Sequence, residues 1–218
     1  AERRDNAEKV LNEMLRTGVT AVRDMAGDAR ALASLSRDAL VGDIVAPNIY
    51  YSSLMAGNEF FTDPRTIATA QGGKSGGMPY MKAIDDHSNI EIEVAQAIGT
   101  GAHGIKMYAI LSKEQVRSIV TEAKKQNIPV WSHGALIPTR PSDVIASGVI
   151  SISHSSMLVQ EYYPNRENIP ASWIGAEAVN MSVQFWDQEY SKLELDNIFR
   201  LMIQHDVVLD ATLTVYDH

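Results

Sequence analysis

The chain has 218 residues, of which 45% are hydrophobic and 21% charged, so it can bury a sizeable core and does not have the composition of a disordered chain. Its formal net charge of −8 argues against nucleic acid and anionic membrane as main partners. The absence of cysteine excludes disulfides and thiolate metal sites, so any metal needs His, Asp, Glu or a modified side chain as ligand. Neither a transmembrane run nor an apolar signal segment is visible, and the compartment stays open.

Helices and strands are expected to alternate along the chain, by the period of the apolar residues. A helix at 5–16 precedes a strand at 19–25, a helix at 29–41, a strand at 48–55 and a long irregular stretch to about 86. Next come a helix at 89–99, a strand at 103–109, a helix at 112–127, a strand at 129–134, a helix at 141–147 and a strand at 149–156. The last part predicts one or two helices between 167 and 180, a short apolar piece at 182–186, a helix at 193–206 and a strand at 207–215.

This alternation is typical of parallel βαβ units, so the predicted fold class is α/β. Two architectures fit the pattern: an open doubly wound sheet, or most of a TIM (β/α)8 barrel. A full barrel usually takes about 250 residues. The six expected strands therefore predict one domain over 1–218, with about six βα units if it is a barrel.

Three residues occupy equivalent places near the carboxyl ends of successive expected strands: Lys106, His133 and His154. In parallel α/β folds this end carries the ligand site, and strands about 4.8 Å apart can direct neighbouring side chains to one atom. Neutral imidazole is a common ligand of divalent ions such as zinc. A single such histidine is more often structural, but two at the same depth beside a strand lysine favour a metal site.

Lys106 lies in the apolar segment HGIKMYA, where burial would lower its pKa and free the amine. A neutral amine can form a Schiff base with a carbonyl substrate, or react with carbon dioxide to give a carbamate that binds metal. A lysine that extends to the rim of the barrel is the structural alternative.

Five segments in order resemble the amidohydrolase superfamily, in particular its prolidase-like and imidazolonepropionase-like enzymes: TGVTAVRDMAGD, GAHGIKMYA, VWSHGA, ASGVISISHSS and VVLDATLT. The resemblance runs from about residue 7 to 215. It implies a TIM-barrel hydrolase that holds one or two divalent ions, most often zinc, and cleaves an amide or cyclic amide through a metal-activated water. By position in the motifs, Lys106 would be the carboxylated lysine that bridges the metals, and His133 and His154 would be histidine ligands.

The chain also departs from the pattern of that superfamily. It has no HxH pair, which the first barrel strand of the family carries, and no strand after residue 215 to carry the general-base Asp. Asp217 and His218 stand in the wrong place for that role, and Ser153 stands where the subgroup usually has Glu. These departures predict a piece that corresponds to barrel strands two to seven, with part of the site missing.

Further residues and functions fit the sequence as well. Arg140, in the loop after His133, could hold a substrate carboxylate. The segment ATAQGGKS at 68–75 approaches a phosphate-binding loop, but no strand precedes it and GGMP follows it. A Schiff-base lyase or aldolase that uses Lys106 and a non-catalytic binding module remain alternatives. Because unpaired barrel edges invite pairing between copies, we expect a homo-oligomer or a poorly stable chain.

Overall fold

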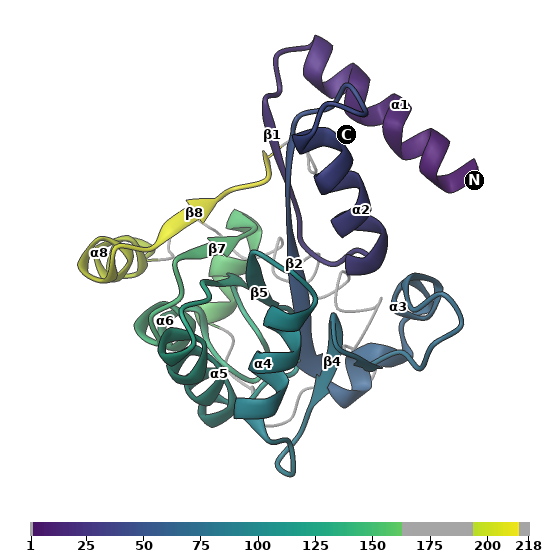
Figure 1. Cartoon of the computed structure of the whole chain (residues 1–218). Helices are drawn as coiled ribbons and strands as arrows, with labels where there is room; N and C mark the ends of the chain where they lie inside the picture. The colour runs from purple at the N-terminus through teal and green to yellow at the C-terminus, as the bar shows by residue number, and fades with distance from the viewer. Residues whose placement is uncertain (1, 163–193, 214–218) are drawn as a thin grey trace.

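Helices and strands alternate in the computed structural model of the chain, which describes residues 2–162 and 194–213 (Figure 1). The helices expected in these ranges are present as α1 Glu2–Arg16, α2 Ala29–Leu40, α4 Ile90–Gly99, α5 Lys113–Lys125, α6 Pro141–Ala146 and α8 Asp196–His205. The expected strands are β1 Ala21–Asp24, β2 Asn48–Gly57, β5 Gly104–Met107, β6 Val130–His133, β7 Ser151–Ser153 and β8 Val208–Asp210. The helices expected between 167 and 180 and the apolar piece at 182–186 lie outside the described residues.

The stretch up to residue 86 is not irregular, and this expectation was wrong. It contains the 3-10 helix η1 Asn58–Thr62, the helix α3 Pro64–Thr69 and the strands β3 Gly77–Met78 and β4 Met81–Ile84. Asp63 caps α3 and Pro64 opens it, which are local signals for a helix start. The strands are short, and β4 forms because β2 leaves its second half unpaired by β1.

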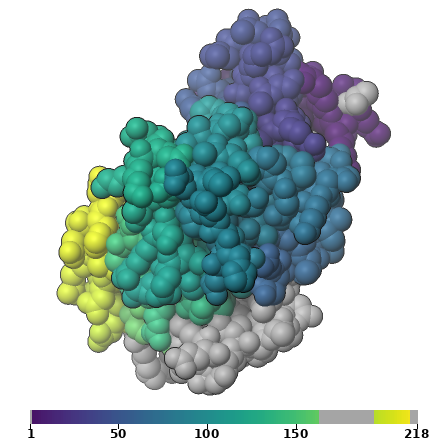
Figure 2. All heavy atoms as spheres, turned by 60° about the horizontal axis from the view of Figure 1, so that its bottom comes forward, coloured from purple at the N-terminus to yellow at the C-terminus, as the bar shows by residue number. Residues whose placement is uncertain are grey.

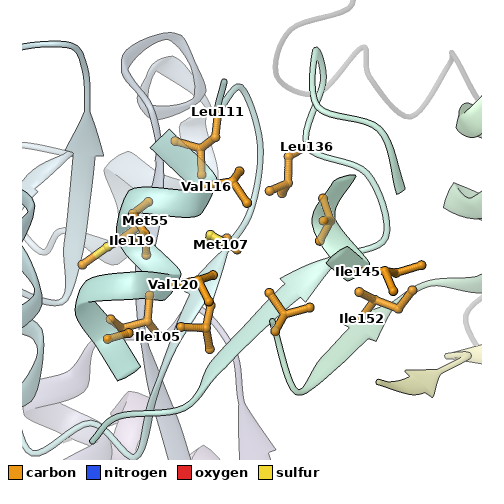
Figure 3. Packing of buried hydrophobic residues seen from close by; sticks show 14 of the residues in the cluster. Met55, Ile105, Met107, Leu111, Val116, Ile119, Val120, Leu136, Ile145 and Ile152 are labelled. Carbon is orange, nitrogen blue, oxygen red and sulfur yellow. The ribbon is translucent and has the colours of Figure 1, made fainter. Parts of the chain in front are cut away.

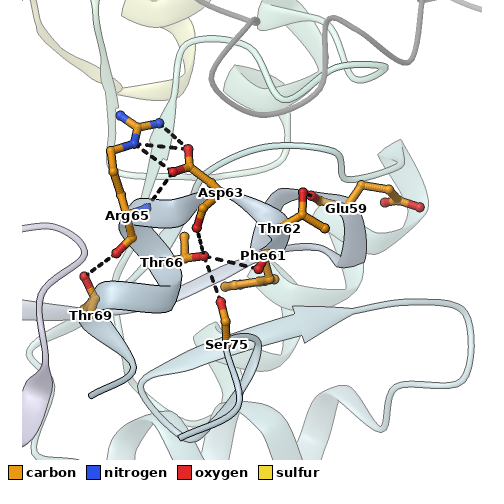
Figure 4. A network of polar contacts seen from close by, with 8 residues as sticks. All are labelled: Glu59, Phe61, Thr62, Asp63, Arg65, Thr66, Thr69 and Ser75. Carbon is orange, nitrogen blue, oxygen red and sulfur yellow. Dashed lines mark hydrogen bonds and ion pairs between the residues drawn. The ribbon is translucent and has the colours of Figure 1, made fainter. Parts of the chain in front are cut away.

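The segment that approaches a phosphate-binding loop has another structure. Residues 70–76 form the turn between α3 and β3, and no helix begins there. The Ser75 hydroxyl donates to Thr66 Oγ1 at 2.8 Å (Figure 4). This segment therefore lacks the strand and helix that a phosphate-binding loop requires.

The sheet is mostly parallel, with strand order β3-β4-β2-β5-β6-β7-β8 and β1 paired to the first half of β2. Only β3 and β4 pair antiparallel. Within residues 2–162 and 194–213, no ladder joins β8 to β1. The α/β class and the parallel sheet are confirmed, and the described sheet is open.

One face of the sheet carries the main core under α4, α5, α6 and α8. Side chains such as Met107, Val130 and Ile152 project from the strands toward Ile119 of α5 and Ile145 of α6 (Figure 3). Each of these five residues is at most 3% exposed. Burial of this apolar area fixes which face of each strand points outward, and the alternate residues must then point to the inner face.

The inner face is more polar. The register aligns Lys106 with Trp131 and Ser151 in one row, and His133 with Ser153 and Asp210 in the next row toward the carboxyl ends. Thus the same alternation that builds the core also places the candidate site residues on one inner surface.

Helix α5 begins with a capping box that the sequence suggested only in part. Ser112 accepts from the Gln115 backbone N–H, and the Gln115 side chain accepts from the Ser112 N–H. We expected an acidic residue for this partner and found none at the position, but glutamine serves equally well. The helix therefore starts at a defined residue directly after the β5 loop.

The two ends of the chain lie apart. Helix α1 stands at one end and has no buried residue, while β8 and α8 lie at the other side of the sheet (Figures 1 and 2). Among the described residues, no helix has the length and apolar character to cross a bilayer.

Candidate active site at the carboxyl ends of the strands

Two imidazole rings meet at the carboxyl end of β6 and β7. His133 Nε2 and His154 Nε2 are 3.2 Å apart, with ring centroids at 4.7 Å. His133 is the last residue of β6 and is 5% exposed, and His154 directly follows β7. The sequence expected both residues at one site, and the structure brings them into contact.

His154 has an unusual backbone conformation that aims its ring. Its φ is +71°, in the left-handed region that non-glycine residues rarely adopt. Its Nδ1 lies 2.7 Å from the hydroxyl of Thr212, whose own φ is +50°. Such conformations cost about 1–3 kcal/mol and cluster at functional sites, where the surrounding structure over-determines them.

Lys106 lies within the sheet and not at its rim. Its side chain belongs to a residue that is 1% exposed, and Nζ donates to Ser153 Oγ at 2.8 Å. The lysine thus spans from its own row to the row of His133. Burial lowers the pKa of Lys106 to about 7, the charge of Arg23 lowers it further, and Asp210 opposes the shift. A substantial fraction of this amine is neutral near pH 7.

Burial also keeps both histidines neutral. It lowers the pKa of His133 well below the usual value, and the charges of Lys106 and His154 act in the same direction. Burial lowers the pKa of His154 as well, followed by the effect of Lys106, while Asp210 opposes it. Neutral imidazole is the form that binds metal.

The histidine pair fits a divalent ion such as zinc. Two nitrogens about 2.0–2.1 Å from a tetrahedral zinc are about 3.3 Å apart, close to the 3.2 Å between the two Nε2 atoms. No group of three His, Asp or Glu side chains within 2–162 and 194–213 could hold a metal. A third ligand from the described residues would therefore have to come from another group, and a carboxylated Lys106 would supply two oxygens.

An aromatic wall adjoins the pair. The ring of Tyr108 lies against His133 with centroids 3.8 Å apart, and Phe60 of η1 lies against Tyr108 at 4.6 Å. Burial raises the pKa of Tyr108. The sequence analysis missed both rings, because η1 was expected to be irregular and Tyr108 was read only as part of a strand.

An ion pair closes the inner face below the site. Arg23 of β1 lies over the Trp131 ring at 4.7 Å and reaches Asp210 of β8 at 3.4 Å. These residues were also missed, since they are up to 187 positions apart in the chain. Their side chains are 31% and 45% exposed for Arg23 and Asp210, so the pair contributes little to stability by itself.

The other residues considered lie away from the histidine pair or serve the backbone. Arg140 is exposed and donates from Nη1 to the Glu161 carbonyl at 2.9 Å, so its binding of a substrate carboxylate stays a prediction. Asp24 accepts from the Ala26 and Gly27 amides and closes a turn. Asp217 and His218 lie outside the described residues.

Comparisons with known proteins were made by family, by sequence and by structure. No protein-family model matches the chain, and no curated protein does either. Several solved structures are similar in fold. They include a prolidase complexed with N-methylphosphonate-L-proline, at 21% identity and a TM-score of 0.62, with 96% of this chain and 46% of that chain covered.

Two further structures have comparable similarity. A Xaa-Pro dipeptidase with bound methionine in the active site is 18% identical at a TM-score of 0.60, with 94% of this chain and 44% of that chain covered. The A. niger ochratoxinase is 18% identical at a TM-score of 0.61, with the same coverages of 94% and 44%. The chain thus has the fold of part of an amidohydrolase and spans less than half the length of these three proteins.

Proposed function

We propose that the chain is part of a metal-dependent amidohydrolase built on a TIM barrel, which cleaves the C–N bond of an amide or cyclic amide. The observation that carries this proposal is the His133–His154 contact beside buried Lys106, at the carboxyl ends of parallel strands. Neighbouring structures named prolidase and Xaa-Pro dipeptidase support a dipeptide-like substrate. An imidazolone-like cyclic amide is the other substrate class that the sequence motifs suggest.

His133 and His154 would hold a divalent ion, most often zinc, and Lys106 would bind it after reaction with carbon dioxide. When bound, such an ion lowers the pKa of water and polarises the scissile carbonyl. The chain's own residues prepare this step, because burial keeps the imidazoles neutral and lowers the pKa of Lys106 to about 7. Thr212 fixes the orientation of His154 through Nδ1, as the outer partners of metal-binding histidines do.

The proposal is tested by hydrolysis. We expect zinc-loaded chain, alone or completed by the remaining barrel strands, to release the amino acid from dipeptides or N-acyl amino acids. Activity should be lost with a chelator and in His133→Ala. Hydrolysis that continues unchanged in the presence of a chelator would overturn the metal-dependent mechanism.

A Schiff-base lyase is the second candidate, because the neutral amine of Lys106 is also a nucleophile. It predicts that borohydride traps a carbonyl substrate on Lys106 and that chelators have no effect. Arg140 remains a candidate for the substrate carboxylate, and a homo-oligomer remains our expectation for the isolated chain, to be checked by light scattering.

A further inference from the structure

An arginine that the sequence analysis passed over lies beside the candidate site. Arg65 is the second residue of α3, in the segment that follows β2 at the same end of the sheet as His133. The Gly57 amide at the end of β2 donates to the Ala109 carbonyl, just after Tyr108. The segment with η1 and α3 therefore starts at the level of the candidate site.

Arg65 is held firmly but remains open to solvent. Its Nε and Nη2 donate to the Asp63 carboxylate at 3.1 and 2.5 Å (Figure 4). The Asp63 side chain is 1% exposed, whereas that of Arg65 is 64% exposed. A guanidinium has five N–H donors, and Asp63 engages only Nε and Nη2. The edge with Nη1 has no hydrogen-bond partner among the described residues, so it can bind a second carboxylate.

A matched arginine elsewhere in the fold shows what a purely structural role looks like. Arg30 follows Asp28 at the start of α2 with the same spacing and the same backbone cap. Its Nη2 also donates to the Tyr80 hydroxyl at 3.0 Å, and its guanidinium lies over the Tyr80 ring. Arg30 is thus used within the fold, while the described contacts of the Arg65 guanidinium go to Asp63 alone.

The charge of Arg65 acts on the candidate site. It lowers the pKa of Tyr108 and contributes to the lowered pKa of His133, so the guanidinium is within electrostatic reach of both rings. Phe60 and Tyr108 form an apolar wall between α3 and the histidine pair. A positive edge, an apolar wall and a hydrolytic centre are together the elements that recognise an amino-acid derivative with a free carboxylate.

We propose that Arg65 is a specificity-determining residue that binds the free carboxylate of an N-acyl amino acid, with its apolar side chain against Phe60 and Tyr108. This inference rests on the proposed function, since it deepens the substrate class of the same site. It assigns to Arg65 the role for which Arg140 was the candidate in the sequence. Asp63 then serves as the residue that positions the guanidinium.

Binding of N-acetyl-L-leucine and of its C-terminal amide, measured by calorimetry, tests the proposal. Metal-free protein in chelator is used, because a carboxylate would also bind zinc. We expect the acid to bind at least about tenfold tighter than the amide, as for a hydrogen-bonded charge pair. Arg65→Met should abolish this preference, Arg65→Lys should retain part of it, and the matched control Arg30→Met should keep it.

Two results would overturn the inference: equal or undetectable binding of acid and amide in the parent chain, or a preference that survives in Arg65→Met. Because no metal and no hydrolysis enter the assay, its outcome is independent of the reaction. A preference that depends on Arg65, in a protein that hydrolyses no amide, would reject the proposed function and leave this inference standing.

Discussion

Replacement of Lys106 by methionine tests whether the fold holds this lysine against its own charge. The pKa of Lys106 is lowered from 10.5 to about 7, a difference of about 3.5 pH units. At about 1.4 kcal/mol per unit, keeping the ammonium buried costs about 5 kcal/mol at acidic pH. Methionine has a similar volume and no charge, so Lys106→Met removes this cost but leaves Ser153 Oγ without the amine that donates to it.

The sign of the pH dependence follows from proton binding. Between about pH 7 and 10.5 the unfolded chain keeps the Lys106 proton while the folded chain releases it. The free energy of unfolding therefore rises with pH in this window. For pKa values of 7 and 10.5, we expect the parent chain to gain about 2 kcal/mol relative to Lys106→Met between pH 7 and 9.

Urea unfolding at pH 7, 8 and 9, in chelator and carbon-dioxide-free buffer, measures this difference. The loss of the Ser153 contact shifts the two stability curves by about 1 kcal/mol at every pH, so it does not change their relative slope. Curves that run parallel from pH 7 to 9 would refute the reasoning, because they would mean that Lys106 keeps an ordinary pKa in the folded state.

Three other changes test the packing and the local signals by urea unfolding. A Cβ on Gly104 would come within 2.4 Å of the Trp131 ring, so Gly104→Ala should destabilise by about 1–3 kcal/mol; Gly99, with open space around it, is the control, and equal effects would contradict this packing. Ser112→Ala removes the capping box and should cost about 1 kcal/mol, and an unchanged midpoint would show that α5 does not depend on its cap. Ile145→Ala, at 0% exposure, should cost about 2–5 kcal/mol, and a loss below 1 kcal/mol would mean that α6 packs loosely.

Much of the fold could be predicted because its signals are local. Helix α5 carries apolar residues on one face and a serine cap, and β5 and β6 are short apolar runs between helices. Strand β4 could not be predicted in this way. It depends on the unpaired second half of β2, a long-range relation that four residues of sequence do not express.

The candidate site follows the same division. Equivalent strand-end positions were enough to place His133 and His154 together, since register in a parallel sheet brings such positions to one edge. The partners of that pair were not predictable from one sequence. Tyr108 contacts His133 through the twist of the sheet, and Arg65 faces the site only because η1 and α3 fold back at the end of β2.

The measurement that tests the central proposal most directly is bound zinc per chain, by elemental analysis after loading in bicarbonate buffer. Parent chain, Lys106→Ala and His154→Ala are compared, with His87→Ala as the control because that histidine is exposed. The account predicts stoichiometric zinc in the parent and in the control, and loss of zinc in the other two variants. Zinc that stays bound without His154, or a parent chain that binds none, would contradict it.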